Sequence, residues 1–285
     1  MTPFGARLDA AMSAHGPLCV GIDPHAALLD AWGLPDDAAG LRRFALTVLE
    51  AVGGRVAAVK PQSAFFERHG AAGVAVLEEV VAAGRDTGTL VVVDAKRGDI
   101  GSTMGAYADA YLRDGSPLAG DALTVSPYLG FGSLAPAVEA AHATGRGLFV
   151  LALTSNPEGP AVQHARDAEG VAVADRVARE AAVANAAELA ATGGALGSVG
   201  LVVGATVGEA AERLGVDLAA VRGPLLAPGV GAQGAGPAEL AAVFGAARPA
   251  VLASSSRGVL AAGPSVAGLR EAALRAAGEA GAALR

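Results

Sequence analysis

Val91-Val92-Val93-Asp94-Ala95-Lys96-Arg97-Gly98-Asp99, residues 91–99, is an apolar run that passes directly into alternating acid and base. A short, continuous apolar run bounded by polar residues is typical of a strand that is buried on both faces, as in a parallel sheet. The same pattern recurs along the chain, and an alanine-rich amphipathic stretch follows each apolar run. The segment is therefore predicted to be one of a series of βα units.

Eight such strands are predicted. They cover approximately residues 18–22, 56–60, 89–93, 122–126, 147–153, 199–204, 224–228 and 249–254. With helices between them, eight parallel strands predict a closed (β/α)8 TIM barrel, formed by residues 1–285 as a single domain. A doubly wound open sheet is the alternative, because closure cannot be read from one sequence. A further helix over 4–14 is expected to cover the bottom of the barrel.

The composition restricts the partners of the protein. A net charge of -7 and a pI near 5.2 differ from the basic clusters of proteins that bind nucleic acid. The single cysteine, Cys19, lies in an apolar run and fits a reducing compartment. The apolar runs are too short to cross a membrane, and no leader opens the sequence. We expect a cytoplasmic protein with neither a nucleic-acid nor a membrane partner.

Polar residues gather where the predicted strands end. In either fold, reactive groups should lie just beyond the carboxyl ends of parallel strands. These positions hold Asp23, Lys60, Asp94, Lys96, Ser126, Thr154, Ser155, Gln233 and Arg257. Packing alone does not require such a ring, so this end of the barrel is the predicted functional site.

The charges in this ring alternate in sign. Asp94 and Lys96 point to the same side of their strand and, by themselves, could equally form a structural ion pair. Lys60 and Asp23 end neighbouring strands, so that four charges can surround one point. A lysine among carboxylates stays protonated and can deliver a proton, while a carboxylate can repel a negative substrate group whose loss relieves the repulsion. This pattern favours the removal of CO₂.

Several motifs carry a specific resemblance. They are Gly21-Ile22-Asp23-Pro24, Val59-Lys60-Pro61-Gln62-Ser63-Ala64-Phe65-Phe66-Glu67, Asp94-Ala95-Lys96-Arg97-Gly98-Asp99-Ile100-Gly101-Ser102-Thr103, Ser126-Pro127-Tyr128-Leu129-Gly130, Thr154-Ser155-Asn156-Pro157, Pro228-Gly229-Val230-Gly231-Ala232-Gln233-Gly234 and Ser254-Ser255-Ser256-Arg257-Gly258. In this order they resemble the orotidine 5′-phosphate decarboxylase family, more closely its longer bacterial (type 2) branch. The matches run from the first strand to the last.

The resemblance implies an enzyme that converts orotidine 5′-monophosphate (OMP) to UMP and CO₂ in pyrimidine biosynthesis. It implies that Lys96 stabilises the carbanion at C6 of the pyrimidine and then protonates that carbon. Asp94 would lie against the scissile carboxylate of the substrate. Asp23 and Lys60 would bind the ribose hydroxyls, and Lys60 would also join the catalytic charges.

The same resemblance implies a homodimer. The second carboxylate of the Asp-x-Lys-x-x-Asp motif, Asp99, would reach into the site of the neighbouring subunit. Ile100 and Thr103 would contribute to that site with it.

The rest of the substrate is assigned in the same way. Ser155 would recognise the pyrimidine edge, and Gln233 would link the pyrimidine side to the phosphate. Arg257 and the backbone of Gly258 would hold the 5′-phosphate. Loops after strands seven and eight often bind phosphate in barrels, and an arginine offers a planar donor for its oxygens.

Neither a metal nor an organic cofactor is predicted. The five histidines lack the spacing of a zinc site, and the resemblance implies direct decarboxylation by electrostatic preorganisation. Three other interpretations stay open. They are a magnesium-dependent decarboxylase of keto-acid sugar phosphates in the same superfamily, a Schiff-base aldolase using Lys60 or Lys96, and a barrel that binds a nucleotide without turnover.

Overall fold

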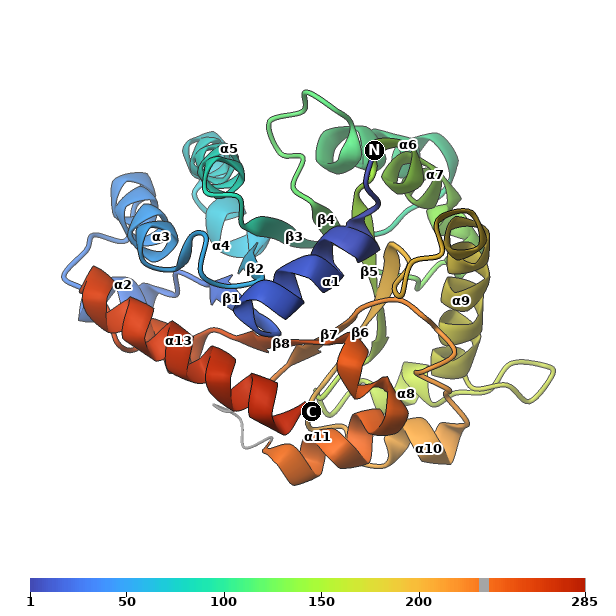
Figure 1. The fold of residues 1–285 in the computed structure, drawn as a ribbon. Coiled ribbons are helices and arrows are strands. Elements are labelled where there is room, and N and C mark those ends of the chain that lie inside the picture. Colours follow the sequence, from blue (N-terminus) through green and yellow to red (C-terminus); the bar gives the residue numbers. More distant parts are fainter. Residues whose placement is uncertain (231–235, 285) are drawn as a thin grey trace.

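The computed structural model describes residues 1–230 and 236–284, in which eight parallel strands form a closed barrel (Figure 1). The strands are β1 (Leu18–Ile22), β2 (Ala58–Pro61), β3 (Leu90–Arg97), β4 (Ala122–Val125), β5 (Gly147–Leu153), β6 (Val199–Val203), β7 (Leu225–Pro228) and β8 (Val251–Ser255). Each strand pairs with the next along the chain, and β8 also pairs with β1. The predicted (β/α)8 barrel is therefore confirmed, and the open-sheet alternative is wrong because no edge is left between β8 and β1 in the described barrel.

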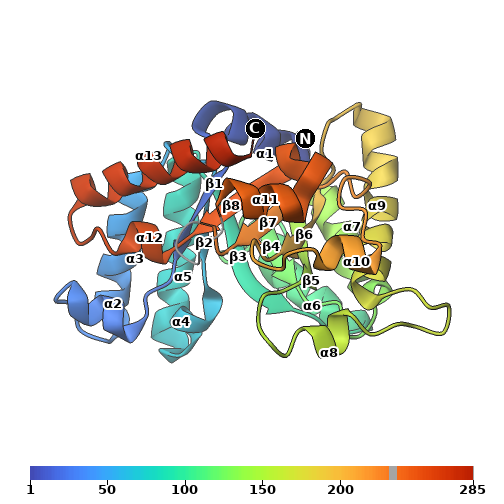
Figure 2. The ribbon, with the colours of Figure 1, turned by 90° about the horizontal axis from the view of Figure 1, so that it is seen from below.

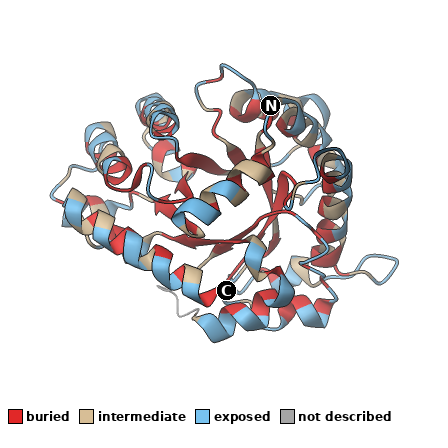
Figure 3. Ribbon diagram, in the orientation of Figure 1, coloured by how far each residue is buried: buried red, intermediate tan, exposed pale blue. Residues whose placement is uncertain are grey.

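Helices surround the barrel, with buried inner faces and exposed outer faces (Figure 3). They are α1 (Phe4–His15), α2 (Ala26–Ala31), α3 (Ala38–Val52), α4 (Ser63–Glu67), α5 (Gly70–Asp86), α6 (Gly101–Leu112), α7 (Ala135–Thr144), α8 (Pro160–Gln163), α9 (Val173–Thr192), α10 (Ala210–Leu214), α11 (Pro237–Phe244), α12 (Arg257–Leu260) and α13 (Val266–Ala283), with 3-10 turns at Phe131–Leu134 and Gly245–Ala250. Among the described residues, no helix combines the length and apolar character needed to span a membrane.

Successive side chains of each strand alternate between two hydrophobic cores, one between the barrel and the helices and one inside the barrel. In β3, Val91 and Val93 pack outward against the helices, whereas Val92 points into the barrel with Phe149 and Leu226. Successive side chains of a strand point to opposite faces, so residues of the same parity as Val92 continue into the barrel. Asp94 has that parity, and it is buried. The fold thus directs this carboxylate to the barrel axis.

The N-terminal helix closes one end of the barrel. Figure 2 shows α1 and α8 at opposite ends of the molecule. Phe4 and Leu8, one helical turn apart, are fully buried and join the cluster inside the barrel. The Phe4 and Phe149 rings meet edge to face, with centroids 5.9 Å apart. The helix predicted over 4–14 is confirmed, and it occludes the end opposite the carboxyl ends of the strands.

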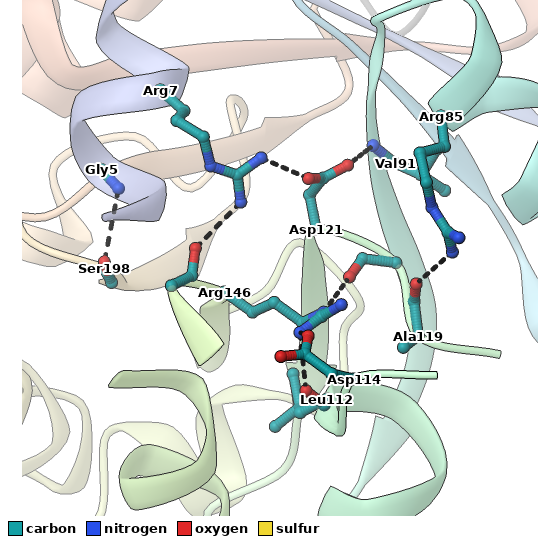
Figure 4. A network of polar contacts seen from close by, with 12 residues as sticks. Gly5, Arg7, Arg85, Val91, Leu112, Asp114, Ala119, Asp121, Arg146 and Ser198 are labelled. Atoms are coloured by element: carbon teal, nitrogen blue, oxygen red, sulfur yellow. Dashed lines mark hydrogen bonds and ion pairs between the residues drawn. The ribbon is translucent and has the colours of Figure 1, made fainter. Parts of the chain in front are cut away.

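Polar contacts fasten this closed end (Figure 4). Arg7 of α1 pairs with the Asp121 carboxylate and donates to the Gly145 carbonyl at 2.9 Å. Asp121 also accepts from the Val91 backbone N–H at 2.9 Å. Arg146 donates to Asp114 at 2.6 Å. Because these contacts join α1 to the entry of β3 and to the segments before β4 and β5, they give the barrel a fixed base below the site.

Candidate active site

A cavity of about 760 Å³ opens at the carboxyl ends of the strands. Its lining includes residues from several strand ends: Asp23, Lys60, Asp94, Lys96, Thr124, Ser155 and Arg257. The apolar side chains of Leu151, Val202 and Leu226 form part of the same wall. The cavity therefore joins a charged region to an apolar one, as is typical of sites that orient an organic ligand.

The strand that carries Asp94 and Lys96 is longer and less regular than predicted. β3 continues to Arg97 instead of ending near residue 93, and its pairing with β4 shifts between Val93 and Arg97. Lys96 has a φ of 48°, an uncommon backbone conformation for a residue with a side chain. The Thr124 hydroxyl accepts from the Lys96 backbone N–H at 2.9 Å. This contact helps to hold the strained residue, a feature often found at functional sites.

Asp94 lies at the centre of the charge array. Lys60 Nζ donates to its Oδ2 at 2.8 Å, and Lys96 Nζ donates to its Oδ1 at 2.6 Å. The Thr124 hydroxyl adds a contact of 2.8 Å to Oδ1. The Lys60 side chain is 8% exposed, whereas that of Lys96 is 43% exposed. Lys60 is thus a buried counterion, and Lys96 carries its ammonium group into the cavity.

The protonation states follow from these contacts. Burial opposes ionisation of Asp94, but the charges of Lys60 and Lys96 outweigh burial and lower its pKa from 3.8 to about 2. Burial also disfavours the charged form of Lys60, yet Asp94 and then Asp23 raise its pKa above the ordinary value. At neutral pH the site therefore contains a carboxylate and a buried ammonium ion that stabilise one another.

Asp23 presents an oxygen that lacks a partner. Among the described residues its Oδ1 is buried and accepts no hydrogen bond. Because a buried, unpaired carboxylate oxygen is costly, this atom suits a ligand that brings a donor such as a hydroxyl group.

Two residues around Asp94 had no predicted role. Thr124 is a hydroxyl in an otherwise apolar strand, and its parity with Ala122 places it inside the barrel. Gln62 follows Lys60-Pro61, and only one orientation of its amide satisfies its neighbours. In that orientation the amide nitrogen donates to Asp94 Oδ2 at 2.8 Å, and the oxygen accepts from Lys96 Nζ at 3.2 Å. The sequence signal that could have identified Gln62 as a site residue is its place as a polar residue directly after a strand.

Several predicted site residues lie apart from this cluster. Ser155 and Arg257 line the cavity, but Gly258 lines a second, smaller pocket between α11 and α13. Within the described residues, the cavity lining does not include the segment from Asp99 to Thr103, where Ile100 is 61% exposed. Gln233 lies outside the described residues.

Comparisons with known proteins agree with this architecture. The sequence model described as the "Orotidine 5'-phosphate decarboxylase / HUMPS family" matches residues 16–272. The chain is 62% identical over 284 residues to an orotidine 5′-phosphate decarboxylase of Salinispora arenicola, covering 100% of this chain and 99% of the relative. A crystal structure from Streptomyces avermitilis has a TM-score of 0.94 and 61% identity, over 100% of this chain and 96% of the other. The Leishmania donovani OMP decarboxylase structure has a TM-score of 0.76 and 32% identity, over 99% of both chains.

The closed parallel barrel, with lysine and aspartate charges in a cavity at the carboxyl ends of its strands, and the family match place the chain in the class of barrel carboxy-lyases. Within that class, the chain belongs to the orotidine 5′-phosphate decarboxylase / HUMPS family. The resemblance seen in its motifs is confirmed.

Proposed function

We propose that this chain decarboxylates OMP to UMP and CO₂ in pyrimidine biosynthesis. The observation that carries the proposal is the Lys60–Asp94–Lys96 array, in which a carboxylate with a lowered pKa adjoins an ammonium group that enters the cavity. This arrangement disfavours a second carboxylate beside Asp94 and favours a carbanion beside Lys96.

Lys96 is the proton donor in this reaction. The bond between C6 of the pyrimidine and its carboxylate breaks, CO₂ leaves, and the electron pair stays on C6. The Lys96 ammonium stabilises that pair and then transfers a proton to C6. Asp94 repels the substrate carboxylate before the bond breaks, and its charge is fixed because Lys60, Lys96 and Thr124 all donate to it.

The remaining polar residues hold the nucleotide. Asp23, with its unpaired Oδ1, and Lys60 bind the ribose hydroxyls. Ser155 contacts the pyrimidine edge from the end of β5. Arg257, after β8, binds the 5′-phosphate together with the backbone of Gly258, and Gln233 links the pyrimidine side to the phosphate. Binding energy from the phosphate, remote from C6, is available to stabilise the transition state.

The active protein is a homodimer in this proposal. Asp99, Ile100 and Thr103 complete the site of the partner subunit. Ile100, Tyr128 and Leu129 are large apolar residues with exposed fractions of 61%, 77% and 53%, and they follow the adjacent strands β3 and β4. The Ser126 backbone N–H donates to the Arg97 carbonyl at 2.8 Å, so the segments begin side by side. Such exposed apolar residues suit a protein interface.

Mixed dimers test the shared site. Lys96→Ala and Asp99→Ala each inactivate the protein, but in opposite subunits of a mixed dimer they leave one complete site. Equal mixing after reversible dissociation should restore about one quarter of wild-type activity, because half of the dimers are mixed and half of their sites are complete. Failure to recover activity, with mixed dimers demonstrated by mass spectrometry, would contradict the shared site.

The reaction uses no organic cofactor or metal in this proposal, and the protein acts in the cytoplasm. The first experiment is to follow the loss of orotate-ring absorbance when chelator-treated protein is mixed with OMP. Formation of UMP supports the proposal. Activity that appears only with a keto-acid sugar phosphate and magnesium would favour the metal-dependent alternative. Borohydride trapping of a lysine adduct would favour an aldolase, and UMP binding without turnover would favour a nucleotide-binding barrel.

A further inference from the structure

Gln62 is the residue from which the further inference starts. Its amide nitrogen donates to Asp94 twice, at 2.8 Å to Oδ2 and at 2.7 Å to the backbone carbonyl. Its amide oxygen faces Lys96 Nζ at 3.2 Å. One neutral side chain therefore contacts both the carboxylate and the ammonium group of the proposed reaction. It contacts them from the position directly after β2, whereas both charged residues belong to β3.

The backbone holds Gln62 in place for this contact. Its N–H donates to the Ile22 carbonyl of β1 at 3.3 Å, and the residue forms an isolated parallel bridge with Asp94. Pro61, the last residue of β2, precedes it, and its ring fixes the φ of the position from which the chain enters Gln62. Gln62 is half-buried and, within the described residues, is not part of the cavity lining. Its side chain therefore reaches the two charged groups from beside the cavity.

The amide matches what this location requires. A carboxylate has about four acceptor positions, and Asp94 receives donors from Lys60, Lys96, Thr124 and Gln62. A glutamine offers a donor to Asp94 and an acceptor to Lys96 from one planar group, without adding charge. Lys96 lies on a strained backbone and its side chain is 43% exposed, so its ammonium group needs such an external restraint.

We propose that Gln62 is a positioning residue that sets where the Lys96 ammonium group lies relative to Asp94 and to C6 of the substrate. The inference rests on the proposed decarboxylation, and it assigns to Gln62 an effect on the proton-transfer step and none on nucleotide binding. Loss of the amide removes one of the contacts that restrain Lys96 Nζ beside Asp94. A displacement of about 1 Å at a reacting group can reduce a rate by about 100-fold.

One variant removes the proposed function of the amide. Gln62→Met keeps the length of the side chain but removes both hydrogen-bonding groups. Gln163→Met is the matched control, because the Gln163 amide contacts Thr154 at 2.9 Å and 2.7 Å and not a charged group. Thermal unfolding establishes that each variant is folded.

We expect kcat of Gln62→Met to fall by about 10- to 100-fold, with the dissociation constant of UMP within about twofold of the wild-type value. Gln163→Met should keep kcat within about twofold of wild type, because its amide contacts Thr154 and neither Asp94 nor Lys96. A kcat of Gln62→Met within about twofold of wild type, or an equal loss of kcat in Gln163→Met, overturns the inference.

A second measurement is independent of turnover. The sequence contains two lysines, Lys60 and Lys96, so protein labelled with ¹³C at lysine Cε gives one signal from each. The chemical shift of the Lys96 signal should change in Gln62→Met and stay unchanged in Gln163→Met, and a Lys96 signal that is identical in wild type and Gln62→Met would contradict the inference. If wild-type protein fails to decarboxylate OMP, the proposed function is wrong, and this comparison of chemical shifts still shows whether Gln62 faces Lys96.

Discussion

Asp94→Asn removes the negative charge at the centre of the site while nearly preserving side-chain volume. Lys60, whose side chain is 8% exposed, then loses an anionic partner at 2.8 Å. The pKa of Asp94, about 2 against an ordinary 3.8, corresponds to about 2 kcal/mol of favourable interaction in the folded protein. Removing one partner of a buried pair costs about 3–5 kcal/mol in general. Because Asp23 still attracts Lys60, we expect the free energy of unfolding to decrease by about 2–4 kcal/mol at pH 7.

Urea denaturation followed by circular dichroism measures this change. Lys60→Met removes the buried charge that Asp94→Asn leaves unpaired. The free energy of unfolding of the double variant should therefore exceed the value expected from adding the two single losses, by about 1 kcal/mol or more. The contribution of Asp94 is present above its unfolded pKa and is lost as pH falls from about 4 towards 2, so wild type and Asp94→Asn should converge there. The buried-pair reasoning would be refuted if Asp94→Asn lowered the free energy of unfolding by less than about 0.5 kcal/mol at pH 7. It would also be refuted if the effects of Asp94→Asn and Lys60→Met were strictly additive in the double variant.

Further predictions concern activity. Lys96→Ala should abolish turnover and leave UMP binding largely intact by calorimetry; near-normal turnover would remove Lys96 from its role as proton donor. Arg257→Ala should weaken binding of OMP by about 10- to 100-fold, because a charged hydrogen bond to phosphate is lost, and should change orotidine binding little. An unchanged affinity for OMP would count against the phosphate assignment. Treatment with chelator should leave OMP decarboxylation unchanged, whereas a loss restored by magnesium would support the metal-dependent alternative.

Much of the architecture could be predicted because its signals are local. The apolar runs predicted all eight strands, and seven of them lie within about two residues of the predicted bounds at each end. Strand parity also predicted that Asp94 and Lys96 lie on one side of their strand, and both residues line the cavity. The extension of β3 to Arg97 was missed because polar residues after an apolar run are usually interpreted as a loop.

The contacts that define the site could not be predicted in the same way. Asp94 is held by Lys60, 34 positions earlier, and by Thr124, 30 positions later, and these distances along the chain carry no periodic signal. The positive φ of Lys96 and the amide orientation of Gln62 depend on the pairing of β3 with its neighbours. The residue types that end each strand, and the face that they share, can be read from the order of amino acids, because side-chain identity and alternation are local properties. Which of those side chains touch depends on the folded barrel, because closing eight strands sets register and distance for all of them together.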